Sequence, residues 1–241
     1  AKARAKANMR TTTIRVNALG ERIFTDTTGP FPTSRGGMKY FICAVDDCSD
    51  MTWTYFSRTK KDVPEFMRQL ILQINGSGKK IKFVRCDNTG EHMGKLQELC
   101  LNNGVQIEYT APHTPQQNSR VEKKIHILWQ RSMTMMVNAR LNKEVQEKFW
   151  AEAVACATYL ENLTIKKGRK IPALEAWTGE NVRHWILKLV EFGRLGVVVN
   201  RSKIKTKMNQ RGTTVMMTGY AMDHGAGMYR LNNPSTNRIF F

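Results

Sequence analysis

The chain has 241 residues, 41% hydrophobic and 24% charged, which suits a globular protein with one large domain or a core with a small appendage. Its longest apolar runs are too short to cross a bilayer, and its first residues lack the apolar stretch of a signal peptide. The 38 basic residues outnumber the 20 acidic ones, giving a formal net charge of +18, which indicates a polyanionic partner. Nucleic acid fits this excess better than a membrane surface, because the basic residues do not line one face of an amphipathic helix.

Cysteine and histidine are scattered along the chain, and no two cysteines form a Cys-x-x-Cys pair. Five unpaired cysteines, mostly with apolar neighbours, are typical of reduced core residues in an intracellular protein. We therefore expect buried free thiols and no zinc in this chain.

The first half of the chain predicts alternating strands and helices. Residues 1–20 are polar and basic, contain no acidic residue, and are expected to form an extended arm. The elements that hydrophobic periodicity and turn residues predict after it are strands 22–28, 38–46 and 52–57, a helix from 63 capped by Asp62, strand 81–86, helix 95–102, strand 105–109, a long helix from about 118, and a helix over 143–163.

This order, β-β-β-α-β-α-β-α followed by a helix, predicts an α/β fold. Three strands with tight connections form a meander, and the two later strands are reached through helices, which gives a five-stranded mixed sheet flanked by helices. That arrangement matches the ribonuclease-H-like fold. We divide the chain into a basic arm (1–20), a catalytic core (21–141), a helical extension (142–177) and a small basic β module (178–241), whose expected strands are 195–199, 213–220, 228–231 and 238–241.

Three acidic residues are placed where such a fold can bring them together. Asp26 lies inside the first strand, Asp87 directly follows the fourth, and Glu122 lies one turn into the long helix, beside the buried face. Three carboxylates meet the needs of two divalent cations that act on a phosphodiester. Any one of these acids alone is more often structural, and Asp46 and Asp47 are expected to brace the turn that they adjoin.

The segments around these acids resemble the catalytic core of integrases from copia-type long-terminal-repeat retrotransposons, relatives of retroviral integrases. The resemblance covers about residues 21–241. The segments that carry it include Asp26-Thr27-Thr28-Gly29-Pro30, Arg85-Cys86-Asp87-Asn88-Thr89-Gly90-Glu91, Thr114-Pro115-Gln116-Gln117-Asn118 with Glu122, and Phe149-Trp150-Ala151-Glu152-Ala153.

The resemblance implies that Asp26, Asp87 and Glu122 are the catalytic, metal-holding triad. It implies a DNA integrase that joins 3′ ends of element DNA to target DNA with two Mg²⁺ or Mn²⁺ ions per site. The implied partners are double-stranded DNA and further copies of the chain, with no membrane. The implied location is the nucleus, with a virus-like particle in the cytoplasm.

Three departures from the family pattern support a second interpretation. The zinc-binding module that precedes the family's core is missing from the sequence, the offset from Asp87 to Glu122 is 122 − 87 = 35, one residue shorter than usual, and Ser119-Arg120 replaces a small glycine. The alternative is an inactive or domesticated relative that keeps the fold as a nucleic-acid-binding or scaffold module. A ribonuclease H or a cut-and-paste transposase would share the fold and the metals, but the Pro-Gln-Gln-Asn segment before Glu122 disfavours both.

Basic and amide side chains near the triad and farther along the chain are candidate DNA contacts. Those in the loop before the long helix would touch terminal bases, whereas the basic ones suit sequence-independent phosphate contact. The alternative for the helical residues is a solvated face. The candidates are Gln116, Gln117, Asn118, Arg120, Lys123, Lys124, His126, Lys166, Lys167, Arg169, Lys170, Arg201, Lys203, Lys205 and Lys207.

Overall fold

A computed structural model of the chain describes residues 16–87, 93–109, 119–199, 212–221, 227–236 and 238–241. Most of the predicted arm, the two loops at 88–92 and 110–118, and the basic segment 200–211 lie outside the described residues.

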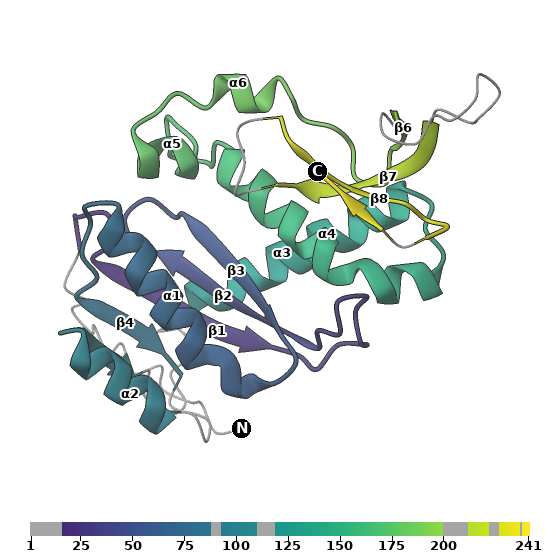
Figure 1. Cartoon of the computed structure of the whole chain (residues 1–241). Coiled ribbons are helices and arrows are strands. Elements are labelled where there is room, and N and C mark those ends of the chain that lie inside the picture. The colour runs from purple at the N-terminus through teal and green to yellow at the C-terminus, as the bar shows by residue number, and fades with distance from the viewer. Residues whose placement is uncertain (1–15, 88–92, 110–118, 200–211, 222–226, 237) are drawn as a thin grey trace, which may run out of the picture.

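One mixed sheet forms the centre of the N-terminal half (Figure 1). Its strands are β1 (Arg22–Thr28), β2 (Tyr40–Asp46), β3 (Thr52–Ser57), β4 (Phe83–Cys86) and β5 (Gln106–Tyr109), in the spatial order β3-β2-β1-β4-β5. β1, β2 and β3 pair antiparallel, whereas β4 lies parallel to β1 and to β5. The predicted five-stranded mixed sheet is therefore confirmed.

Helices cover both faces of this sheet, and each face has its own core. A short 3-10 turn (Lys60–Asp62) leads into α1 (Val63–Gly76), which packs with α2 (Met93–Asn102) on one face. On the other face α3 (Ser119–Asn138) and α4 (Lys143–Leu163) pack against each other, with Trp150 at 1% exposure in their core. This α/β arrangement is the ribonuclease-H-like fold.

Among the described helices, α4 begins with a side-chain N-cap and α1 does not. The Asn142 side chain accepts a hydrogen bond from the backbone N–H of Val145 at 3.0 Å, as an N-cap residue should. Asp62 makes no side-chain capping bond, so the prediction that it caps α1 is wrong. The 3-10 turn in front of α1 already fixes the start of the helix, and the Thr59 hydroxyl accepts from Lys61 N–H at that turn.

The C-terminal part adds two short helices and a second sheet. The elements are α5 (Ala173–Thr178), α6 (Arg183–Ile186), β6 (Leu195–Val199), β7 (Gly212–Tyr220), β8 (Tyr229–Asn232) and β9 (Ile239–Phe240). The four strands pair in sequence order, each antiparallel to the next, so the four predicted strands are confirmed.

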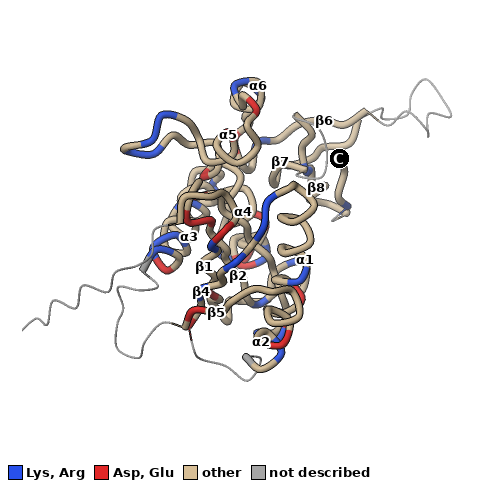
Figure 2. Tube along the Cα trace, turned by 90° about the vertical axis from the view of Figure 1, so that its left-hand side faces the viewer, with Lys and Arg blue, Asp and Glu red and all other residues tan. Residues whose placement is uncertain are grey.

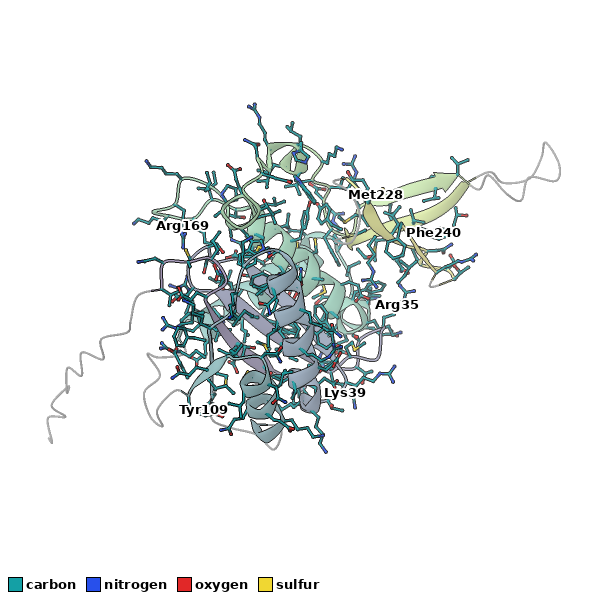
Figure 3. All side chains as sticks on the ribbon, turned by 60° about the vertical axis from the view of Figure 1, so that its left-hand side comes forward. Arg35, Lys39, Tyr109, Arg169, Met228 and Phe240 are labelled. Carbon is teal, nitrogen blue, oxygen red and sulfur yellow. The ribbon has the colours of Figure 1, made fainter. Side chains whose placement is uncertain are left out.

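The second sheet packs on α4 and on the loop after β1. The rings of Tyr159 and Tyr220 stack with centroids 4.2 Å apart. Arg35, which lies between the two parts of the molecule in Figure 3, hydrogen-bonds to the Asn232 side chain and lies over the Phe149 ring. These contacts fix the position of the C-terminal sheet relative to the first.

All five cysteines are free thiols, and four are buried, as predicted; Cys48 is partly exposed.

Among the residues described, no helix combines the length and the apolar character needed to cross a membrane.

Candidate active site

Asp26 projects from the middle of β1, opposite Cys43 of β2. One of its carboxylate oxygens accepts a hydrogen bond from Thr27 N–H at 2.7 Å. Its pKa is raised to about 6 by burial and, to a smaller extent, by the negative charges of Glu122 and Asp87, against the opposing effects of the Thr27 N–H and the Lys60 ammonium. Asp26 therefore lies within electrostatic reach of both other predicted acids.

The sheet brings Asp87 level with Asp26. β1 and β4 run parallel, with Arg22 opposite Phe83 and Phe24 opposite Arg85. Continuing this register by two residues places Asp87, directly after β4, beside Asp26. The Asp87 side chain is exposed, so it can reach a bound ion or a substrate.

Glu122 is carried by α3, which packs on the sheet face opposite to α1 and α2. It lies in the first turn of α3 and is exposed, whereas Val121 beside it is fully buried in the core between α3 and the sheet. Successive residues of a helix point about 100° apart, so Glu122 emerges at the edge of the buried face. Its negative charge contributes to the raised pKa of Asp26, so the two carboxylates lie within electrostatic reach of each other.

Three carboxylates that repel one another form a suitable oxygen ligand set for Mg²⁺ or Mn²⁺, because a divalent cation would remove the repulsion. Within the described residues, no three His, Cys, Asp or Glu side chains already form a group that could hold a metal ion. The loops 88–92 and 110–118, which adjoin Asp87 and α3, lie outside that description. Asp26, Asp87 and Glu122 therefore supply oxygen donors of the kind that these cations prefer, although in the described structure they stand as three separate acids.

The candidate DNA contacts that flank Glu122 divide into two sets. Lys123 and His126 are exposed. The Arg120 guanidinium instead contacts Asp47 and Asp50, and the Lys124 ammonium is 5% exposed and hydrogen-bonds to Asp50 at 2.9 Å and to Glu161 at 2.8 Å. This placement argues against the predicted phosphate contact for Lys124, because its donors are directed to carboxylates inside the protein.

The basic loop between α4 and α5 is exposed for most of its length (Figure 2). Lys167, Arg169 and Lys170 are exposed, and Arg169 donates one hydrogen bond to the carbonyl of Cys48 at 2.8 Å. Lys166 is 25% exposed, with its ammonium bound to Asp50 and Glu161. The predicted contacts that lie outside the described residues are Gln116, Gln117, Asn118, Arg201, Lys203, Lys205 and Lys207.

Sequence reasoning did not predict the network of ion pairs that centres on Asp50 and Glu161. Asp50 accepts from Arg120, Lys124 and Lys166, and its pKa is lowered to about 2, because the attraction of Lys124 and the bonds from both lysines outweigh its burial. Glu161, 2% exposed, pairs with two of these cations and with Arg131. No local sequence motif marks such ion pairs. The structure itself shows that the turn is constrained, because Asp50, a non-glycine residue, adopts the left-handed backbone conformation with φ 67°.

Asp46 and Asp47 brace the β2–β3 turn, as predicted. Asp46 is fully buried and accepts from the backbone N–H groups of Gly20 and Ser49, at 2.8 and 2.7 Å. Asp47 pairs with the buried Arg22 at 3.2 Å and with Arg120.

Comparison with known proteins adds a family. No family model matches the chain. Over 222 residues the chain is 32% identical to the retrovirus-related Pol polyprotein from transposon TNT 1-94 of Nicotiana tabacum. The aligned region covers 90% of this chain and 16% of the polyprotein. The corresponding polyprotein of transposon RE1 from Arabidopsis thaliana is 29% identical over 143 residues, 59% of this chain and 9% of the polyprotein.

A solved structure shares the fold. A chain in the cryo-EM structure of the simian T-cell lymphotropic virus intasome, solved in complex with PP2A regulatory subunit B56 gamma, superposes with a TM-score of 0.54. The superposition covers 93% of this chain and 76% of the other, at 14% sequence identity. The chain belongs to the retrovirus-related Pol polyproteins of copia-type retrotransposons, and it spans about a sixth of the tobacco relative.

Proposed function

We propose that this chain is the catalytic part of a DNA integrase, a metal-dependent polynucleotidyl transferase that joins 3′ ends of element DNA to target DNA. The observation that carries the proposal is the strand register that sets Asp87 beside Asp26, together with the position of Glu122 at the start of α3, from where its charge acts on Asp26. The family supports it, because the matched segment belongs to transposon polyproteins.

The three carboxylates would hold two Mg²⁺ or Mn²⁺ ions, which supply a polarised attacking hydroxyl and a stabilised leaving oxygen for in-line displacement. Asp26 and Asp87 are fixed relative to each other by the hydrogen bonds between β1 and β4. Glu122 is carried on a separate element and would complete the ligand set. Half-burial of Asp26 keeps part of the water away from its carboxylate and so strengthens its interaction with a cation.

Exposed cations beside the triad would position the DNA. Lys123 and His126 lie on the same helix as Glu122, one and four residues after it. Lys167, Arg169 and Lys170 form a second exposed basic group on the loop that leads into α5 (Figure 2). Such contacts fix the register of a duplex without reading its sequence.

The biological setting belongs to the same proposal. The structural neighbour is part of an intasome, which supports assembly of several copies on DNA ends. Action on chromosomal DNA requires access to the nucleus, and the chain would reach it from a cytoplasmic virus-like particle.

Strand transfer by purified protein tests the proposal. A labelled duplex with the element's terminal sequence is incubated with a target duplex and Mn²⁺, using wild type, Glu122→Gln and a control, Glu180→Gln, at an exposed acid beyond α5. We expect joining by wild type and by the control, and none by Glu122→Gln. Salt-sensitive DNA binding without joining by any of the three proteins would contradict an active integrase and favour a nucleic-acid-binding relative.

A further inference from the structure

The first turn of α3 is attached to the β2–β3 turn through Arg120. The two terminal nitrogens of its guanidinium contact different carboxylates, Nη1 that of Asp47 and Nη2 that of Asp50, the latter at 3.3 Å. The guanidinium carbon also lies 5.6 Å from the centre of the Phe24 ring, two residues before Asp26 on β1. One side chain thus connects α3 to β1 and to the β2–β3 turn.

Lys124 provides a second attachment one turn later. Its ammonium is 2.9 Å from Asp50 and 2.8 Å from Glu161 of α4, in an environment where only 5% of the lysine side chain is exposed. Burial disfavours its charge, yet its pKa is raised above the ordinary value, because the attraction of Asp50 and the hydrogen bond to Glu161 outweigh that cost. The attachment is therefore ionic over the whole neutral pH range.

The two attachments lie on one side of the helix and Glu122 lies on the other. At about 100° per residue, Arg120 projects about 100° to one side of the buried Val121, and Glu122 about 100° to the opposite side. Lys124 projects about 60° from Val121 on the same side as Arg120. Any rotation of α3 that moved Glu122 would have to break the contacts of Arg120 and Lys124.

We propose that Arg120 is a positioning residue that fixes the rotation of α3 about its axis, so that Glu122 faces Asp26 and Asp87. The inference rests on the proposed function, since it assigns to Arg120 the geometry of the same metal-holding triad. Arginine is suited to this position, because its planar guanidinium presents two donors in fixed directions, one to Asp47 and one to Asp50.

Mn²⁺ binding by the full chain, measured by electron paramagnetic resonance without DNA, tests the inference. Arg120→Ala removes both contacts, and Arg120→Lys keeps the charge but not the fork. The matched control is Arg68→Ala, which removes an exposed arginine–carboxylate pair with Glu65 on α1, away from the triad. Circular dichroism and thermal unfolding confirm that each variant folds.

The charge effect and the positioning effect have opposite signs in Arg120→Ala. Loss of a nearby positive charge alone would tighten Mn²⁺ binding, whereas loss of the geometry should weaken it by about tenfold, the range seen when groups that support metal ligands are removed. We expect weaker binding in Arg120→Ala, weakening in the same direction in Arg120→Lys, and no change in Arg68→Ala.

Unchanged or tighter Mn²⁺ binding in the folded Arg120 variants would overturn the inference while leaving the proposed function intact. Absence of Mn²⁺ binding by wild type would overturn the metal site itself, and the positioning role with it. If Arg120→Ala does not fold, Arg120→Lys decides the question, because it preserves the charge that faces Asp47 and Asp50.

Discussion

The Lys124 ammonium lies 2.8 Å from the Glu161 carboxylate, and these side chains are 5% and 2% exposed. α3 and α4 are therefore joined by a buried ion pair as well as by their apolar contacts. Burial by itself would raise the pKa of Glu161, but its hydrogen bonds to Lys124 and Lys166 hold it below the ordinary value. The fold thus places charged groups in the interior and compensates them there.

Breaking this pair should be costly. Lys124→Met leaves Glu161 and Asp50 with fewer cations in a buried environment, and we expect the free energy of unfolding to fall by about 3 kcal/mol. Urea denaturation at pH 7 measures it. Lys148→Met is the control, because it removes an exposed ion pair with Glu144 on α4 and should cost less than about 0.5 kcal/mol. Equal losses in the two variants would show that burial does not matter here.

Asp26 predicts a pH-dependent stability in the absence of metal. Its pKa is raised from 3.8 to about 6, so the folded state favours the protonated form, and this contribution is present below pH 4 and is lost as the pH rises through 6. Asp26→Asn should therefore stabilise metal-free protein at pH 7.5, by about 2 kcal/mol, and have little effect at pH 4.

At pH 7.5, added Mn²⁺ should make wild type more stable than Asp26→Asn. Wild type is expected to gain stability from the ion, and Asp26→Asn to gain little, because one ligand is missing. Thermal unfolding of wild type and Asp26→Asn at pH 4 and pH 7.5, with and without Mn²⁺, measures these differences in stability. A variant that Mn²⁺ stabilises as much as wild type would remove Asp26 from the metal site.

The basic loop before α5 should contribute to DNA affinity through phosphate contacts. Replacing Lys167, Arg169 and Lys170 by glutamine should weaken binding to any duplex and reduce the slope of log K against log salt by about 3. Fluorescence anisotropy from 50 to 300 mM salt, roughly the range where such slopes are measured, provides the test. The same substitution at Lys61, Lys80 and Lys95, exposed residues on the α1 and α2 side, should leave the slope unchanged.

Trp150 should be the most sensitive core position between α4 and the sheet. It is 1% exposed, its ring lies within 6.5 Å of those of Phe31, Phe41, Phe56 and Trp129, and its Nε1 donates to the Pro32 carbonyl at 2.7 Å. Trp150→Ala should cost about 4 kcal/mol through the cavity and the lost hydrogen bond. Chemical denaturation measures the loss, and a cost below about 1 kcal/mol would contradict this packing.

Sequence patterns predicted the fold through local periodicity. The stripe of α1, from Val63 to Ile74, is buried as its spacing required, and the alternation of 22–28 produced β1. The parallel pairing of β1 and β4 followed from the helical crossover between them, and it carried Asp87 to Asp26. The helix stripe and the strand alternation could be predicted because each depends on residues close together in sequence, whereas the β1–β4 pairing, which joins Arg22 to Phe83, followed from the rules for connecting strands through helices.

The partners of Arg120 and Lys124 could not be predicted in the same way. Asp47 and Asp50 precede Arg120 by 73 and 70 residues, and Glu161 follows Lys124 by 37. In the sequence both cations flank Glu122 and look like exposed phosphate contacts. Only the folded structure shows that they face carboxylates. The local sequence around a basic residue is the same whether its side chain contacts solvent or a buried acid.

The side attachments of α3 bear on the spacing between Asp87 and Glu122. Strand register sets Asp26 and Asp87, whereas the helix that carries Glu122 is held by its contacts with the β2–β3 turn and with α4. Under the proposed role of Arg120, these contacts rather than the length of the preceding chain set the direction of Glu122. We therefore expect a 35-residue offset to be compatible with the same arrangement of acids as a longer one.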